Sequence, residues 1–344
     1  MKTLSIAIPV YNTEDYIRRC LDSVLVQEAL PYIELIIVND GSKDSSPEII
    51  REYQARFPEN IVFIDKENGG HGSTINAALK AATGKYFRVL DSDDWFDTPE
   101  FIKYLKALSA CDEDLIVTPY TQEYVYNGTV VPYDYEFFTH DQVYSVDELV
   151  FDESKTYYTM ASSTYKLEIL HKSGLKLFEK SFYVDMQYNI YPIPYLKTVH
   201  FLDYHVYRYF MGRPNQSMSQ ENLLRNLPNH QNVLSFLIEY YVSFREKVSK
   251  NVKEYMSLLI YFMFYTHMDL VCNKLKDRRL AYRTIKDFDT YLKNTAPDLY
   301  RMVDVFPYIH FSRRLRYINV RFFNSFFTKL LVFARKVRGK LKRS

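Results

Sequence analysis

Short apolar runs alternate with helix-like patterns over the first 120 residues. The apolar runs have the length of strands and are rich in Ile, Val, Phe or Tyr; they cover residues 4–10, 33–38, 61–64, 86–90 and 115–117. Between them, apolar residues three and four positions apart predict helices over residues 15–27, 47–57, 73–82 and 99–108. Repeated βαβ units of this kind predict an α/β fold with a mostly parallel sheet and helices on both faces.

The pattern changes after Tyr120. The segment 124–131 predicts a β-hairpin in which Asn127 and Gly128 form a two-residue tight turn. From there to about Phe210 the chain is mixed and rich in tyrosine, which fits an extension of the sheet that lines a cleft. From Gln220 to about residue 300 the apolar spacing predicts helices.

Composition narrows the class of protein. A hydrophobic content of 47% in 344 residues supports a sizeable core, and 25% charged residues argue against a largely disordered chain. The three cysteines, Cys20, Cys111 and Cys272, are widely spaced and odd in number. This spacing predicts neither a disulfide framework nor a metal knuckle, and it indicates a reducing cytosol.

The net charge of +2 hides an asymmetry. Residues 305–344 contain eleven Lys or Arg and no Asp or Glu, whereas the preceding residues contain 33 basic and 42 acidic side chains. From Phe311 onwards, apolar residues at three- and four-residue steps predict an interfacial amphipathic helix that is attracted to anionic lipid. Arg321, Asn324 and Lys329 interrupt any membrane span. The alternatives are a helix docked on the acidic body and a nucleic-acid arm, which the Phe-rich content disfavours.

Carboxylates follow the apolar run at 86–90. Alternation along an extended chain points Asp91 and Asp93 the same way, so their charges repel unless a cation lies between them. Mg²⁺ and Mn²⁺ prefer oxygen ligands and share them with phosphate. Because open α/β sheets bind ligands at the carboxyl edge, we predict a divalent-metal site there. The alternative is a solvated turn in which Asp94 or Asp97 caps the next helix.

Other predicted strands also end in polar residues. Asp40 follows the second strand, where its carboxylate is placed to accept a hydrogen bond from an imide such as that of uracil, and Tyr11 follows the first strand, placed to stack on a base. Gly69, Gly70 and Gly72 open the helix after the third strand and permit close approach of a phosphate. Their spacing matches neither a Walker loop nor the dinucleotide-binding fingerprint.

Taken in order and spacing, these motifs resemble the family 2 glycosyltransferases of the GT-A fold, of the bacterial cell-surface polysaccharide type. The segments that carry the resemblance are Pro9-Val-Tyr-Asn, Val38-Asn-Asp-Gly-Ser-Lys-Asp-Ser, Glu67-Asn-Gly-Gly and Leu90-Asp-Ser-Asp-Asp-Trp. The match is close over residues 3–120 and looser to about 220. We expect a GT-A domain at 1–219 (donor half 1–120, acceptor half 121–219), a helical region at 220–304 and a basic amphipathic tail at 305–344.

The resemblance implies roles for named residues. The set implied to hold the base and its surroundings is Pro9, Tyr11, Glu14, Asp40, Lys66 and Asn68. Gly70 and Ser92 join this donor-binding set, and Asp91 is implied to lie by the ribose. Asp93 is implied to bind the Mn²⁺ or Mg²⁺ that bridges the diphosphate of a UDP-sugar.

The sequence departs from the family pattern in two places. Many members carry Ala-Arg-Asn where this chain has Thr74-Ile75-Asn76, which leaves diphosphate charge for the metal, Lys66 or His71 to balance. The later Glu-Asp pair of the family becomes Val184-Asp185. Inverting transfer needs a carboxylate that takes the proton of the acceptor hydroxyl. Asp185 is the candidate, with Glu179 as the runner-up; the alternative role of Asp185 is a helix cap.

Two arginines complete the candidate site. Arg208 and Arg213 resemble a family segment that folds over the donor phosphates, and a guanidinium offers fork-like donors to a diphosphate. The simpler reading is that both are surface arginines beside a Gly-Arg-Pro turn.

The expected protein is thus a metal-dependent, inverting hexosyltransferase. It is expected to move a sugar from a UDP-sugar to a lipid-linked or membrane-proximal glycan, as a peripheral protein at the cytoplasmic face of the membrane, without binding nucleic acid. The missing Glu and Arg favour a second hypothesis, a non-catalytic nucleotide-sugar or glycan-binding protein on the same scaffold. A nucleotidyltransferase is disfavoured, because no basic glycine-rich loop follows the first strand.

Overall fold

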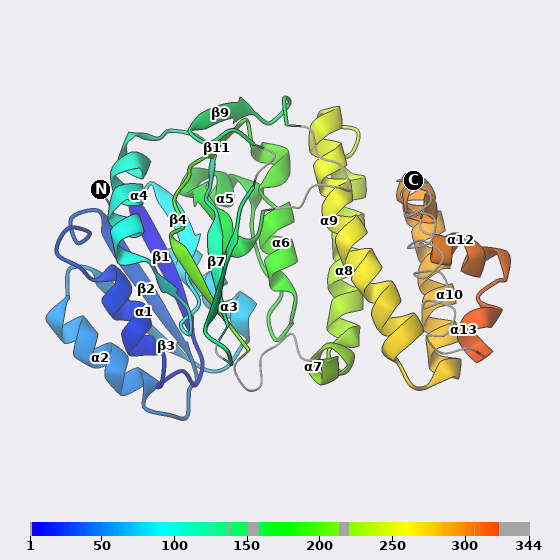
Figure 1. Ribbon diagram of the computed structural model, residues 1–344, viewed down its shortest axis with the longest axis horizontal. Helices are drawn as coiled ribbons and strands as arrows, with labels where there is room; N and C mark the ends of the chain where they lie inside the picture. The colour runs from blue at the N-terminus through cyan, green and yellow to red at the C-terminus, as the bar shows by residue number, and fades with distance from the viewer. Residues whose placement is uncertain are drawn as a thin grey trace. The chain divides into compact units, whose positions relative to one another are not determined.

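The computed structural model describes residues 2–124, 126–135, 138–149, 158–212, 220–305 and 307–322. The chain forms two compact units (Figure 1). The first unit comprises Met1–Gln216 and Val248–Tyr255, and the second comprises Ser217–Lys247 and Met256–Ser344.

An eight-stranded sheet organises the first unit. Its strands are β1 (Leu4–Val10), β2 (Ile33–Asp40), β3 (Ile61–Lys66), β4 (Tyr86–Val89), β6 (Leu115–Val117), β9 (Gln142–Ser145), β10 (Ser163–Lys166) and β11 (Thr198–Phe201). The order is β3-β2-β1-β4-β10-β6-β11-β9. Strands β1 to β4 pair in parallel, whereas β10 runs antiparallel to both of its neighbours. The predicted, mostly parallel α/β sheet is confirmed.

Helices cover both faces of this sheet (Figure 1). They are α1 (Ile17–Val24), α2 (Ser46–Arg56), α3 (His71–Ala81), α4 (Thr98–Ala110), α5 (Leu167–Ser173) and α6 (Val184–Ile190). On one face, alternate residues of β1 such as Ile6 and Ile8 join a core with Leu21 of α1 and Tyr104 of α4. Helix α3 packs on β1 and β2. Every residue of β1 is therefore buried, which explains why its sequence is continuously apolar.

A second, four-stranded sheet follows, in the order β5-β12-β7-β8. Its strands are β5 (Trp95–Phe96), β7 (Tyr120–Tyr124), β8 (Thr129–Tyr133) and β12 (Tyr207–Met211). Strands β7 and β8 form the predicted hairpin, but the prediction of a two-residue turn was wrong. Tyr124 pairs with Thr129, so the connection spans residues 125–128. Asn127 Oδ1 accepts a hydrogen bond from the backbone N–H of Thr129, at 2.9 Å, and so completes a wider turn.

The second unit is helical, as predicted for residues 220–300. Its elements, together with α9, are α7 (Gln220–Arg225), α8 (Leu227–Phe244), α9 (Lys250–Asp269), η3 (Leu270–Lys274), α10 (Arg278–Thr295), α11 (Pro297–Met302), η4 (Val303–Val305), α12 (Pro307–Arg314) and α13 (Ile318–Phe322). The apolar stripe of α8 is buried. Among the described residues one helix, 250–274, is long and apolar enough to cross a membrane, but 72% of its apolar window is buried within the protein, as in a core helix.

The start of the basic tail differs from the prediction. Instead of one amphipathic helix from Phe311, the chain forms α12 and α13, because Arg316 and Tyr317 between them adopt left-handed backbone angles. The guanidinium of Arg313 lies 2.7 Å from Asp289 of α10, and Arg278 donates to the carbonyl of Val320. Residues 307–322 therefore dock on the helical unit, and the remaining tail, 323–344, lies outside the described residues.

Candidate functional site

The loops after β1 and β2 interlock at the carboxyl edge of the sheet. The backbone N–H of Asn12 donates to Ser42 Oγ at 3.0 Å, and Asn12 Oδ1 accepts from the N–H of Lys43 at 2.8 Å. Glu14 Oε2 accepts from the N–H of Ser45 at 2.9 Å. These contacts place Tyr11, which is 52% exposed, beside the loop that follows Asp40, whereas Pro9 is buried within β1. Of the residues predicted to hold a base, Tyr11, Glu14 and Asn68 are exposed, whereas Asp40 is buried.

Asp40 organises the glycine loop that opens α3. Its Oδ1 accepts from Lys66 Nζ at 2.6 Å and from the N–H of Gly69 at 2.8 Å, and its Oδ2 accepts from the N–H of Gly70 at 2.8 Å. Burial alone raises the pKa of this carboxyl, but these hydrogen bonds outweigh burial and hold the pKa below its usual value. Asn68 Nδ2 donates to the Asp40 carbonyl at 2.9 Å. Asp40, at the carboxyl edge of the sheet, therefore fixes the conformation of the predicted phosphate-binding loop.

The glycine loop packs against a segment about 100 residues later in the chain. The N–H of Lys180 donates to the carbonyl of Gly69 at 2.5 Å. At Gly72 an added Cβ would lie 2.2 Å from the backbone oxygen of Phe178, so only glycine fits there. Asn76 exchanges two hydrogen bonds of 2.9 Å with the backbone of Leu177. Asn76, to which the sequence analysis gave no role, thus holds the segment that leads to α6.

Three carboxylates cluster after β4. Asp94 is 1% exposed; it accepts from the Tyr207 hydroxyl at 2.6 Å and from the N–H of Phe210 at 2.8 Å. Burial, together with the charges of Asp93 and Asp91, raises the pKa of Asp94 well above its usual value. Asp93 is itself 8% exposed. Strand β12 is thereby tied to the predicted metal-binding loop.

A histidine faces this cluster from the first residue of α3. His71 Nε2 lies 2.8 Å from Asp91 Oδ1. Burial opposes protonation of His71, but the charges of Asp91, Asp185 and Asp93 outweigh burial and raise the pKa of the imidazole. His71 thus supplies a basic side chain near the segment Thr74-Ile75-Asn76, which lacks the arginine of the family pattern.

Asp185 belongs to the same electrostatic cluster. It lies in the first turn of α6, where Tyr183, and not Asp185, is the N-cap residue. Burial raises the pKa of Asp185, the charge of His71 lowers it, and that of Asp91 raises it. The structure therefore brings Asp185 into electrostatic contact with the loops after β3 and β4. Glu179, the runner-up, is exposed.

Arg208 pairs with two carboxylates, one in β7 and one at the start of α4. Its guanidinium lies 2.6 Å from Asp97 and 3.1 Å from Glu123. Asp97 also accepts from the N–H of Glu100 at 3.2 Å, which confirms its predicted role as the N-cap of α4. Two carboxylates thus hold Arg208 near the start of β12. Arg213 lies outside the described residues.

The donor set suits a hard divalent cation. Asp91 and Asp93 offer carboxylate oxygens, the ligands that Mg²⁺ and Mn²⁺ prefer. Burial is the largest cause of the raised pKa of Asp94, and the charges of Asp93 and Asp91 raise it further, so the three carboxylates repel one another. Ser92 is buried and its Oγ accepts from the hydroxyl of Thr13 at 3.0 Å, which fixes the loop between the two carboxylates. These residues fit Mn²⁺ or Mg²⁺.

Comparison with known families gives a match for the part of the chain that contains β1 to β4 and the loops that follow them. Residues 5–172 match the model of Glycosyl transferase family 2. This segment is a family 2 glycosyltransferase domain. EpsH of Bacillus subtilis is 38% identical over 131 residues, 38% of this chain and 37% of EpsH. The poly(ribitol-phosphate) beta-glucosyltransferase of Bacillus spizizenii is 42% identical over 105 residues, 29% of this chain and 16% of that protein. The chain thus matches well under half of the length of either relative.

The comparison of structures extends the likeness to nearly the whole chain. S. aureus TarS, residues 1–349, superposes with a TM-score of 0.66 at 17% identity, covering 93% of this chain and 90% of that one. At this identity the match shows the fold alone, and that fold is GT-A, as the resemblance implied. The family match therefore covers residues 5–172, and the shared architecture includes the helical region.

Proposed function

We propose that this protein is an inverting glycosyltransferase that moves a hexosyl group from a UDP-sugar to a cell-surface glycan acceptor. The observation that carries the proposal is the cluster of Asp91, Asp93, His71 and Asp185 at the carboxyl edge of a family 2 domain. The TarS structure was determined in complex with UDP-GlcNAc, which supports a UDP-sugar as donor. The Bacillus spizizenii relative is named for glucosyl transfer to poly(ribitol-phosphate), which supports a polymeric surface acceptor.

The uracil base is assigned to the edge formed by Tyr11 and Asp40. An ionised carboxylate has about four acceptor positions. Among the described residues, Asp40 Oδ1 accepts from Lys66 and Gly69, and Oδ2 accepts only from Gly70. The hydroxyl of Ser73 also donates to Oδ1, at 3.4 Å. Oδ2 therefore keeps an acceptor position for the imide N–H of the base, while Tyr11 offers its exposed ring for stacking.

The diphosphate is assigned to the loop after β4. Asp93, with Asp91, is assigned to hold Mn²⁺ or Mg²⁺, which when bound supplies positive charge to the leaving diphosphate. Protonated His71 adds a further positive charge at the same edge. Gly70 and Asn68 hold the loop that faces it. Arg208 lies in β12, and Arg213 follows this strand in the sequence.

Asp185 is assigned as the general base. It takes the proton of the acceptor hydroxyl while that oxygen forms a bond to the anomeric carbon and the bond from this carbon to the diphosphate oxygen breaks. A single displacement of this kind inverts the configuration at the anomeric carbon. Burial suits Asp185 to this role, because a raised pKa makes its carboxylate a stronger base.

Donor binding is tested by thermal unfolding with a panel of nucleotide sugars, with and without Mn²⁺. A ligand that binds only the native state stabilises it by about 2.7 kcal/mol at 100 times its Kd. We expect a UDP-sugar to raise the Tm, and Mn²⁺ to enlarge the shift. The same donor is then offered with a surface-polymer acceptor, and transfer is followed by release of UDP. No shift with any nucleotide sugar would contradict the proposal.

One observation favours the second candidate, a non-catalytic sugar-nucleotide-binding protein. Val184 occupies the position of the family's Glu and is buried, so no carboxylate stands next to Asp185 in the sequence. Donor binding that is accompanied by neither transfer nor hydrolysis with any acceptor would support this candidate.

Attachment to the cytoplasmic face of the membrane is proposed for residues 323–344. They contain seven Lys or Arg, no Asp or Glu, and apolar residues at three- and four-residue steps. We expect the full chain to sediment with phosphatidylglycerol vesicles at low salt and to be released as salt rises. Deletion of 323–344, which keeps the docked segment 307–322, is expected to abolish sedimentation. Equal sedimentation of the truncated chain would contradict this assignment, and neutral phosphatidylcholine vesicles are the control.

A further inference from the structure

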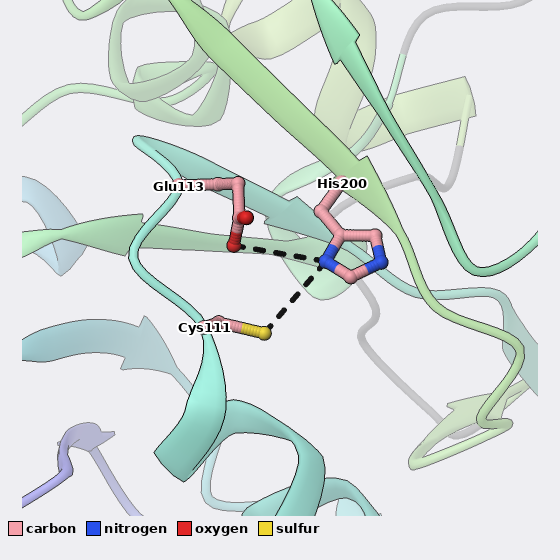
Figure 2. Close-up of side chains that lie close together, drawn as sticks. All are labelled: Cys111, Glu113 and His200. Atoms are coloured by element: carbon pink, nitrogen blue, oxygen red, sulfur yellow. Dashed lines mark hydrogen bonds and ion pairs between the residues drawn. The ribbon is translucent and has the colours of Figure 1, made fainter.

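A second cluster of ligand-type side chains lies away from the site described above (Figure 2). Cys111 follows the last residue of α4, Glu113 precedes β6, and His200 lies in β11, which pairs in parallel with β6. Because β10 is antiparallel to both β4 and β6, those two strands share a direction. The amino end of β6 therefore lies at the sheet edge opposite Asp91 and Asp93.

The three side chains converge on one point. His200 Nδ1 lies 3.7 Å from Cys111 Sγ and 3.7 Å from Glu113 Oε2, and all three ligand atoms lie within 4.8 Å of one another. Figure 2 shows both contacts reaching the same ring nitrogen. A nucleophilic triad instead uses the two ring nitrogens for different partners, one for the nucleophile and one for the carboxylate. The shared nitrogen therefore argues for a common central ligand and against a proton relay.

The distances between the ligand atoms are slightly longer than those in a tetrahedral zinc site. Bond lengths of about 2.3 Å to sulfur and about 2.0–2.2 Å to nitrogen and oxygen place neighbouring ligand atoms roughly 3.3–3.6 Å apart. Small shifts of side chains bring this cluster to that geometry. The His200 and Glu113 side chains are 15% and 20% exposed, so an ion can enter without opening the core.

We propose that Cys111, Glu113 and His200 bind a zinc-like transition-metal ion. A thiolate with an imidazole suits Zn²⁺, whereas Mg²⁺ and Mn²⁺ prefer oxygen ligands alone, so this site and the one at Asp93 select different metals. Three protein ligands leave the fourth position to water or a solute. The ion fastens the end of α4 to β6 and β11.

Metal binding at this site is linked to a proton. Without an ion, Cys111 Sγ lies 3.3 Å from the carbonyl of Ala107, to which the thiol donates a hydrogen bond. Zinc binds the deprotonated sulfur. Formation of the metal–sulfur bond releases the thiol proton to solvent, so apparent affinity falls as pH falls.

Co²⁺ is the probe, because it reports a sulfur ligand by thiolate-to-metal charge-transfer absorption. We expect the chelator-treated full chain to show this band with one Co²⁺ bound per chain, and Zn²⁺ to abolish it by displacement. Cys111→Ser is expected to remove the band. Glu113→Gln and His200→Gln are expected to weaken Zn²⁺ binding by at least about 10- to 100-fold, the loss seen even for partners of metal ligands.

Two controls locate the sulfur ligand. Cys272→Ala removes a buried cysteine of the other unit, and Asp93→Asn changes the opposite sheet edge; both variants are expected to keep the band. If Cys111→Ser fails to fold, the Glu113→Gln variant decides, through loss of the Zn²⁺-induced rise in Tm. Absence of the band, or a band that survives Cys111→Ser, would overturn the proposal.

Discussion

Replacing Asp93 with Asn is expected to lower kcat/KM for sugar transfer by about 10²- to 10³-fold at saturating Mn²⁺. Asparagine keeps the size of the side chain but loses the negative charge that holds the metal. The metal contributes several kcal/mol of charge stabilisation at the leaving diphosphate. Each 1.4 kcal/mol lost from this stabilisation lowers the rate about tenfold. The measurement is release of UDP in the presence of acceptor. A second readout is the part of the donor-induced Tm shift that depends on Mn²⁺, which is expected to disappear.

Loss of folding does not explain the expected effect. Burial raises the pKa of Asp94 most, and the charges of Asp93 and Asp91 raise it further, so removing the charge of Asp93 weakens the repulsion among these carboxylates in the free protein. We expect the Tm of Asp93→Asn without ligand to equal or exceed that of the parent. Asp22→Asn is the matched control, because Asp22 accepts from Tyr53 away from the site, and it is expected to change kcat/KM less than twofold. Retention of half of the activity by Asp93→Asn would remove the basis of the proposed site.

The sequence predicted the sheet well because both of its faces are covered. Burial on two sides makes β1 and β2 continuously apolar, and their abrupt polar ends mark the carboxyl edge. The predicted strands differ from the observed ones by at most two residues at either end. The residues after those strands could therefore be placed at one edge from strand direction alone.

Contacts between distant segments could not be predicted in this way. Asn76 and Leu177 are 101 residues apart, and nothing in either local pattern indicates that they pair. Cys111 and His200 are separated by 89 residues, which is why spacing along the chain excluded a metal knuckle although the fold assembles a possible ligand set. The sequence indicates His71 only as one of several groups that could balance diphosphate charge, and the structure pairs it with Asp91.

The tail shows the limit of periodicity. Apolar steps of three and four residues continue through Leu315 and Ile318, yet the helix stops between them because Arg316 and Tyr317 are left-handed. The ion pair between Arg313 and Asp289 fixes that break on α10. The spacing of apolar residues predicts a helix, but it does not indicate the tertiary contact, here with Asp289, that accompanies the end of the helix.

Asp185→Asn is expected to lower kcat by about 10²- to 10⁴-fold, the usual contribution of a general base, while the Tm shift with the UDP-sugar persists. Glu179→Gln, which changes an exposed acid on the same segment, is the control and is expected to retain activity within twofold. Equal losses in both variants, or loss of donor binding by Asp185→Asn, would point to a disturbed segment and not to a missing base.

The pH profile separates a base from a structural role for Asp185. The carboxylate is active when deprotonated, so the parent rate falls as pH is lowered through the pKa of Asp185, which burial raises. Asp185→Asn is expected to lose this acid limb. The other titrating groups that interact with Asp185 are His71, Asp91, Tyr183 and Tyr209. The two tyrosines have raised pKa values and stay neutral across this range, so His71 and Asp91 set the position of the limb.

His71 provides the decisive variant for this assignment. Its positive charge lowers the pKa of Asp185, so His71→Gln removes a stabilising charge and is expected to move the acid limb to higher pH. Asp91→Asn removes a negative charge that raises the same pKa, and by this interaction alone it moves the limb to lower pH. Opposite shifts in these two variants identify the titrating group as their shared neighbour, Asp185. An acid limb that stays in place in both variants would mean that another group supplies the base.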